Sequence, residues 1–150
     1  MKIEIITVGI LKKSPEKELI DHYLKQLTSS QIKIIEIDQR KFKTLDRWQA
    51  EMESYIQADA YKIFLDETGK NLKSTGFADI FKQKQLENCP ALQFFIGGAD
   101  GFEKSFLQKN ANMKLSLGQM TWPHMLARVM IIEQIYRAIQ ILAGHPYHRD

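Results

Sequence analysis

The sequence alternates between two hydrophobic periods, and this alternation constrains the fold more than any other feature. Short β-branched or apolar runs predict strands at residues 2–8, 32–37, 61–65, 91–96 and 113–117. Between them, apolar residues recur at helical spacing and predict helices that begin near residues 14, 44, 74, 103 and 123. Strands that alternate with helices indicate an α/β fold, with a mainly parallel sheet and helices on both of its faces.

No linker, repeat or low-complexity run divides the 150 residues, so we expect one domain over residues 1–150. A chain of this length buries roughly two-thirds of its unfolded surface and needs no disulfide or metal to stabilise it. The single Cys cannot form an intramolecular disulfide, and Cys89 has no nearby base that would make it a nucleophile. The sequence has no signal-peptide core and no apolar run long enough for a membrane span, so we expect a cytoplasmic protein.

The charge balance permits a polyanionic partner without demanding one. The chain has 21 Lys and Arg against 18 Asp and Glu, a formal net charge of +3. This is well below the charge of a protein that coats nucleic acid.

A glycine-rich segment at residues 97–101 follows an apolar strand and precedes a helix. Its bare backbone fits either a tight turn or a loop that approaches a ligand. It lacks the G-x-G-x-x-G spacing, and the chain contains no G-x-x-x-x-G-K-[ST] motif. These absences exclude the usual dinucleotide and phosphate-loop sites.

A second loop joins the last strand to the last helix. We expect Thr121 to cap this helix and Pro123 to occupy its first turn. Met120 and Trp122 in the same connection are expected to be partly exposed, where they could form the wall of an aromatic-ligand site. The structural and the ligand-binding interpretations both stay open.

The last helix is apolar over most of its circumference, which indicates burial against the sheet and against a second subunit. Arg128, Glu133 and Arg137 interrupt the apolar surface. The spacing of Glu133 and Arg137 favours an ordinary ion pair along the helix.

Two segments combine basic and aromatic residues. The tail at residues 145–149 holds two His residues, too few for a metal site, so we expect no metal. Its cation, imidazoles and ring suit phosphate contact and base stacking instead. Residues 40–43 with Arg47 form either a second basic site, with an aromatic ring inside it, or an ordinary solvated loop.

Several longer motifs occur in a fixed order along the chain. These are an N-terminal K-I-E-I-I-T-V-G, then F-F-I-G-G-A-D-G, L-S-L-G-Q-M-T-W-P-H-M-L-A-R-V, E-Q-I-Y-R-A and the terminal H-P-Y-H-R. In this the chain resembles the ribosomal RNA large-subunit methyltransferase H family, a single-domain branch of the SPOUT methyltransferases. The resemblance implies a deep C-terminal trefoil knot, an exception to unthreaded topology, and a homodimer. It also implies use of S-adenosylmethionine to methylate the position-3 nitrogen of a pseudouridine in 23S ribosomal RNA of the assembled ribosome.

The resemblance also assigns residues. The implied cofactor pocket comprises Leu65, Gly98, Leu117, Gly118, Gln119, Met120, Thr121 and Trp122. The implied RNA contacts are Tyr147, His148, Arg149, Arg137 and His124. In catalysis, His148 has the ordinary pKa of a proton acceptor, whereas Arg149 could stabilise the developing negative charge and make a base unnecessary.

Two alternatives stay open at this point. A SPOUT enzyme could act on transfer RNA or on a ribose hydroxyl. The chain could also be a non-catalytic ribosome-binding factor that uses the same basic tail.

Overall fold

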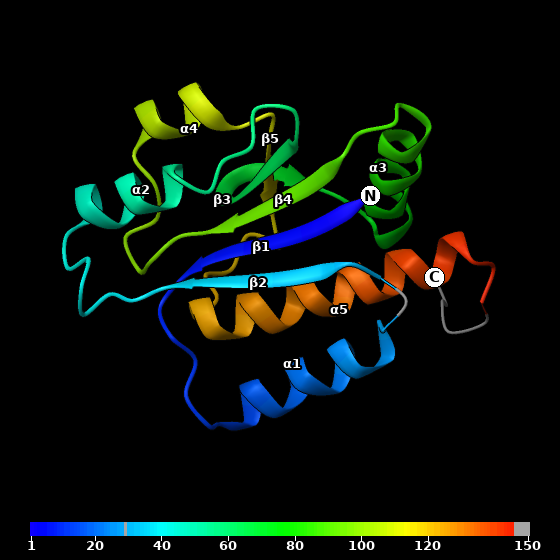
Figure 1. The fold of residues 1–150 in the computed structure, drawn as a ribbon, viewed down its shortest axis with the longest axis horizontal. Helices are drawn as coiled ribbons and strands as arrows, with labels where there is room; N and C mark the ends of the chain where they lie inside the picture. The colour runs from blue at the N-terminus through cyan, green and yellow to red at the C-terminus, as the bar shows by residue number, and fades with distance from the viewer. Residues whose placement is uncertain (29, 146–150) are drawn as a thin grey trace.

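A parallel five-stranded sheet forms the centre of the molecule. The computed structural model describes residues 1–28 and 30–145, and the strands follow the order β2-β1-β4-β3-β5 (Figure 1). Every pairing in the sheet is parallel. The strands are β1 (Lys2–Val8), β2 (Ile32–Ile37), β3 (Tyr61–Asn71), β4 (Ala91–Ile96) and β5 (Met113–Ser116). The predicted α/β class and parallel sheet are therefore confirmed.

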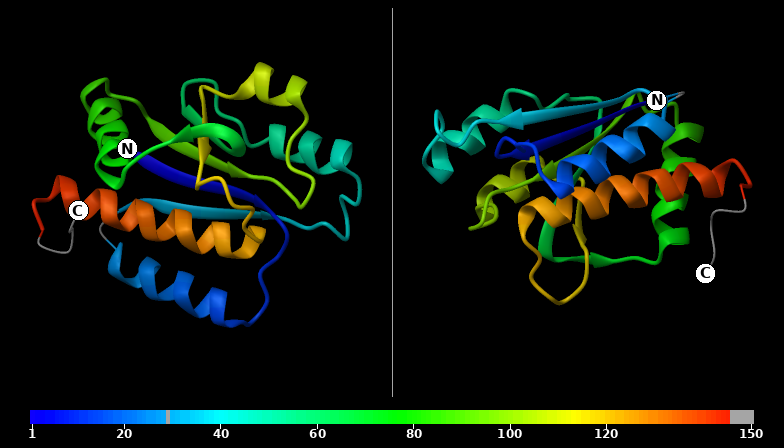
Figure 2. Two further views of the ribbon diagram at one scale, coloured as in Figure 1. Left: turned by 180° about the vertical axis from the view of Figure 1, so that it is seen from behind. Right: turned by 90° about the horizontal axis from the view of Figure 1, so that it is seen from below.

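Helices cover both faces of this sheet. They are α1 (Pro15–Gln26), α2 (Leu45–Glu53), α3 (Ser74–Leu86), α4 (Lys104–Asn110) and α5 (His124–Leu142). Figures 1 and 2 show α1 and α5 side by side on one face and α2 with α4 on the other. Because strand side chains alternate between faces, Ile5 and Phe94 join a core with α1, α3 and α5, whereas Ile6 and Phe95 join a core with α2 and α4.

Local sequence signals set two of the helix starts. The Ser14 hydroxyl accepts a hydrogen bond from the Lys17 amide at 3.2 Å, and Pro15 occupies the first turn. The Thr44 hydroxyl accepts from the Arg47 amide at 3.3 Å. Each side chain satisfies an amide that the first turn leaves without a partner, which confirms the Ser14 cap and the first-turn proline.

The end of β3 differs from the prediction. We expected the strand to stop at Leu65 before a polar loop, but it continues to Asn71, and Leu65 and Lys70 both pair with Leu115 across an irregularity. A Cβ on Gly69 would lie 2.6 Å from the backbone of Leu115, so only glycine allows the chains to pass this closely. The polar side chains in this segment predicted a loop, although its backbone continues to pair with β5.

The trefoil knot implied by the family resemblance stays a prediction, because strand order and register do not establish how the chain threads. Among residues 1–28 and 30–145, none of the helices has both the length and the apolar character that a membrane crossing requires.

Candidate functional site

A cavity of about 320 Å³ opens beside the irregular part of β3, where β4 ends and α5 begins. The carboxyl ends of parallel strands meet at this edge, where open α/β sheets bind their ligands. We call it the carboxyl-edge cavity. It is lined by residues 65–67, 96–102, 121, 122, 124 and 127.

The charged residues in this lining are all carboxylates. Asp66, Glu67 and Asp100 line the cavity, and no Lys or Arg among residues 1–28 and 30–145 does so. The Glu67 carboxylate accepts a hydrogen bond from the Thr121 hydroxyl at 3.1 Å, which links the irregular part of β3 to the loop before α5. The cavity therefore favours a cationic ligand and disfavours a polyphosphate.

The glycine-rich loop brings its backbone close to neighbouring side chains. A Cβ on Gly98 would lie 3.2 Å from Nε2 of Gln39 and 3.7 Å from Nε1 of Trp48. A larger residue there would have to displace these groups or project into the cavity. This close approach explains why glycine occupies the position and is compatible with both the tight turn and the ligand loop.

The loop before α5 is held by its own hydrogen bonds. The Trp122 indole Nε1 donates to the Leu117 carbonyl at 3.3 Å, and the Trp122 side chain stays 42% exposed. Thr121 does not cap α5 as expected. The cap position belongs to Pro123, without a side-chain hydrogen bond, because the Thr121 hydroxyl is directed to Glu67 instead.

His124 begins α5 and forms part of the cavity wall. Its Nδ1 is buried and has no hydrogen-bond partner among the described residues. Burial, together with the positive charge of Arg128, lowers the pKa of His124 below its ordinary value. The imidazole is therefore neutral at neutral pH and can offer a single donor and a single acceptor.

Arg128 lies one turn further along α5, and its side chain is 1% exposed. It donates to the Glu36 carboxylate at 2.7 Å, to the Gly9 carbonyl at 2.9 Å and to the Val8 carbonyl at 3.3 Å. The same Glu36 oxygen accepts from the Leu11 amide at 2.6 Å. Arg128 thus ties the start of α5 to the ends of β1 and β2, a role that the sequence did not reveal.

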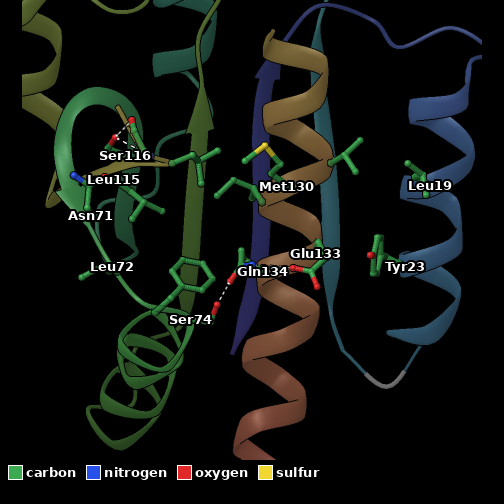
Figure 3. A pocket seen from close by; sticks show the side chains of 15 residues that line it. Leu19, Tyr23, Asn71, Leu72, Ser74, Leu115, Ser116, Met130, Glu133 and Gln134 are labelled. Atoms are coloured by element: carbon green, nitrogen blue, oxygen red, sulfur yellow. Dashed lines mark hydrogen bonds between the residues drawn. The ribbon is translucent and has the colours of Figure 1, made fainter. Parts of the chain in front are cut away.

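A second cavity, of about 480 Å³, runs along α5 between α1, α3 and β5 (Figure 3). We call it the α5 cavity. Its walls are mainly apolar and include Leu19, Leu72 and Met130, while Ser74 donates to the Gln134 side chain at 2.8 Å. Glu133 also lines it and pairs with Arg137 at 2.7 Å, which confirms the predicted helix ion pair.

The predicted cofactor residues do not all share one cavity. Leu65, Gly98, Thr121 and Trp122 line the carboxyl-edge cavity, together with His124, whereas Leu117 and Gly118 line the α5 cavity. Gln119 and Met120 lie in the loop between them and line neither. Met120 is 75% exposed, in line with the expected exposure of this loop.

Comparison with known proteins identifies the family. Residues 1–148 match the family model described as "Predicted SPOUT methyltransferase". The chain is 40% identical to "Ribosomal RNA large subunit methyltransferase H" of Ruegeria pomeroyi, covering 99% of both chains. It is 41% identical to the protein of the same name from Rhodospirillum rubrum, covering 100% of both. The chain belongs to the SPOUT methyltransferase family.

Membership of the SPOUT family indicates methyl transfer as the reaction, which the hydrophobic periodicity of the sequence could not indicate. The family resemblance found in the sequence is confirmed along the chain by the family model and by the relatives named methyltransferase H. Tyr147, His148 and Arg149 lie outside the residues that the structure describes. Within residues 1–28 and 30–145, no group of three His, Cys, Asp or Glu side chains could hold a metal ion.

Proposed function

We propose that this SPOUT methyltransferase transfers a methyl group from S-adenosylmethionine to 23S ribosomal RNA. The proposed acceptor is the position-3 nitrogen of a pseudouridine in the assembled ribosome, and the active unit is a cytoplasmic homodimer of single-domain chains spanning residues 1–150. The names of the relatives support the ribosomal RNA substrate. The negative charge of the carboxyl-edge cavity is the main support for S-adenosylmethionine as the cofactor.

The charge and the lining of the cavity support S-adenosylmethionine as its ligand. The cofactor carries a sulfonium and an ammonium group, and Asp66, Glu67 and Asp100 provide the only formal charges that line the described cavity. The exposed face of Trp122 can contact the adenine, and the bare backbone at Gly98 allows close approach. A volume of about 320 Å³ lies near the lower end of the range for small-molecule sites.

The cofactor supplies an activated methyl group, so the chain needs no nucleophile of its own. Its residues must align the donor with the ring nitrogen and exclude water. The acceptor nitrogen loses a proton, and we assign this proton to His148 or, without a dedicated base, to solvent while Arg149 stabilises the negative charge. A single-turnover pH profile of His148→Ala with an unchanged rate and slope would eliminate the histidine as base.

The homodimer would use the apolar face of α5. Met125 and Leu126 on α5 are 36% and 38% exposed, and Leu19 on the neighbouring α1 is 48% exposed beside the α5 cavity. Exposed apolar side chains on these two neighbouring helices favour a protein partner, and a second copy is always available. Sedimentation that gave a monomer at micromolar concentration would contradict the dimer.

Calorimetry tests the cofactor site directly. We expect Gly98→Val to weaken S-adenosylmethionine binding by more than about tenfold, since its branched side chain must displace Gln39 or occupy the cavity. Gly76→Val is the control, because a Cβ there meets only Leu72, at 3.9 Å, away from the cavity. Equal affinities for the two variants would place the cofactor elsewhere.

The RNA substrate requires a separate experiment. Labelled methyl groups should reach ribosomes that lack only this modification, and not purified transfer RNA. Transfer to transfer RNA or to a ribose hydroxyl would support the alternative SPOUT activity. Absence of S-adenosylmethionine binding would leave only the non-catalytic ribosome-binding factor.

A further inference from the structure

Two neighbouring loops at the carboxyl edge carry the cations that the carboxyl-edge cavity lacks. Residues 9–14 follow β1 and residues 38–44 follow β2, and these two strands pair in the sheet. We call the two loops the cationic strip. It contains five cations, Lys12, Lys13, Arg40, Lys41 and Lys43, and one carboxylate, Asp38. The excess of four positive charges is larger than the net charge of +3 for the whole chain.

The loop at residues 38–44 has a defined shape. The Asp38 carbonyl accepts hydrogen bonds from the amides of Lys41 and Phe42, at 3.1 and 3.0 Å, and the Asp38 side chain accepts from the Arg40 amide at 2.9 Å. Phe42 packs against the core beneath α2, so its ring anchors the loop and is not a stacking platform for a base. The sequence correctly identified the basic residues here, but the aromatic ring has a structural role.

The loop at residues 9–14 is fixed by the buried network described above. The Leu11 amide binds the Glu36 carboxylate, and the Leu11 side chain is 9% exposed. Lys12 and Lys13 follow directly and are exposed. The backbone on both sides of the strip is therefore held in place while its lysines extend into solvent.

Four of these cations are available to a ligand. Arg40 shares the Asp38 carboxylate at 3.4 Å, whereas Lys12, Lys13, Lys41 and Lys43 have no ion-pair partner among residues 1–28 and 30–145. Surface lysines without an ion-pair partner are common, so a binding role for these lysines depends on where they lie relative to the carboxyl-edge cavity. Gln39, which begins this stretch, lies against Gly98 in the wall of the carboxyl-edge cavity.

The side of the cavity formed by the loop at residues 97–103, which Gly98 brings against Gln39, has the reverse charge. The loop at residues 97–103 contains Asp100 and Glu103 and no Lys or Arg. Asp46 beside Glu103 raises the pKa of the Glu103 carboxyl, as expected where negative charges gather. A phosphate chain would be repelled on this side and attracted along the ends of β1 and β2.

We infer that the cationic strip binds the phosphate backbone of the RNA strand next to the nucleotide whose base is presented at the mouth of the carboxyl-edge cavity. The inference rests on the proposed RNA substrate and adds the path of that RNA over the surface. Phosphate contacts of this kind fix position and orientation without reading sequence. The strip would therefore control ribosome binding and leave the chemical step unchanged.

The double variant Lys41→Ala/Lys43→Ala tests this inference. Its control is Lys25→Ala/Lys82→Ala, which removes two exposed lysines from α1 and α3, outside the strip. Methyl transfer to ribosomes lacking the modification would be measured from about 0.05 to 0.2 M salt. We expect the strip variant to raise KM for ribosomes about tenfold with kcat unchanged, and to reduce the slope of log kcat/KM against log salt by about 1.5. The control should match the wild type.

Two results would overturn the inference. One is a KM for the strip variant equal to that of the control. The other is a raised KM with an unchanged salt slope, because the lost contact would then not be with phosphate. Cosedimentation with ribosomes at the same salt concentrations measures the strip independently of catalysis. A wild-type protein that binds ribosomes through the strip but transfers no methyl group would refute the proposed function and leave this inference intact.

Discussion

Arg128 and Arg137 lie on the same helix, yet their environments are opposite. Arg137 follows Arg128 by nine positions, which turn α5 by about 180° beyond two full turns, so the two side chains leave opposite sides of the helix. Arg128 is 1% exposed and reaches Glu36 on β2, whereas Arg137 is 23% exposed and pairs with Glu133 one turn earlier on α5. The first pair joins distant parts of the chain, and the second is local.

This difference assigns the two arginines different roles. Arg128 satisfies two backbone carbonyls and a carboxylate at the ends of β1 and β2, and so cannot reach an RNA. Arg137 remains partly exposed beside the α5 cavity, where a substrate or a second subunit could meet it. A cation in an apolar helix can therefore be either a structural anchor or a binding residue, and only its partners tell which.

Loss of the Glu36 carboxylate should produce the largest effect. Glu36→Ala leaves the buried Arg128 guanidinium without a countercharge and the Leu11 amide without an acceptor. We expect the free energy of unfolding to fall by about 3 kcal/mol, somewhat less than for a fully buried pair because the Glu36 side chain is 33% exposed. Urea unfolding at fixed protein concentration measures this loss.

The matched control is Glu133→Ala, which removes the acidic partner of the local pair. Its expected cost is about 0.5 kcal/mol. Adding Arg128→Met to Glu36→Ala should recover part of the loss, since no charge then stays buried alone. Equal losses for Glu36→Ala and Glu133→Ala would remove the distinction between the two arginines.

The pH dependence of stability gives a second, smaller test of the same network. The pKa of His124 is lower in the folded protein than in the unfolded chain, so the unfolded chain binds more protons as the pH falls. The contribution of neutral His124 to the free energy of unfolding is complete above the pKa of the unfolded chain, about 6.5. It is lost as the pH falls through the pKa of His124 in the folded protein.

We therefore expect unfolding free energies at about pH 7.5 and pH 5 to differ less for His124→Gln than for the wild type. Replacing the exposed His22 with Gln is the control and should leave the difference unchanged. An unaltered pH dependence in His124→Gln would mean that the histidine is not held neutral beside Arg128.

Periodicity predicted the elements of the fold but not its long-range connections. The five strands could be predicted from short apolar runs, because the residues of each run themselves show which side chains are buried. The extension of β3 to Asn71 was missed, since Gly69 fits only against a backbone more than 40 residues later in the chain. No local pattern records such a contact.

The site was predicted unevenly for the same reason. Strand ends and glycine singled out Gly98 and Trp122, and the structure places both in the lining of one cavity, while their role stays a prediction. The pairing of Arg128 with Glu36 was missed because 92 residues separate them. A signal was present in the form of Glu36 in the largely apolar strand β2 and Arg128 in the largely apolar helix α5, but the sequence could not tell which partner each would find.

The smallest effect on stability is expected at Arg137, together with a loss of activity. Arg137→Met breaks the ion pair with Glu133 and should cost about 0.5 kcal/mol in the free energy of unfolding. Under the proposed function the same change lowers the rate of methyl transfer to ribosomes, because the cation itself contacts the RNA. Glu133→Gln separates the two consequences, since it weakens the pair to a similar degree but keeps the arginine. If Glu133→Gln lost as much activity as Arg137→Met, the ion pair and not the cation would be what the reaction requires, and Arg137 would join Arg128 as a structural residue.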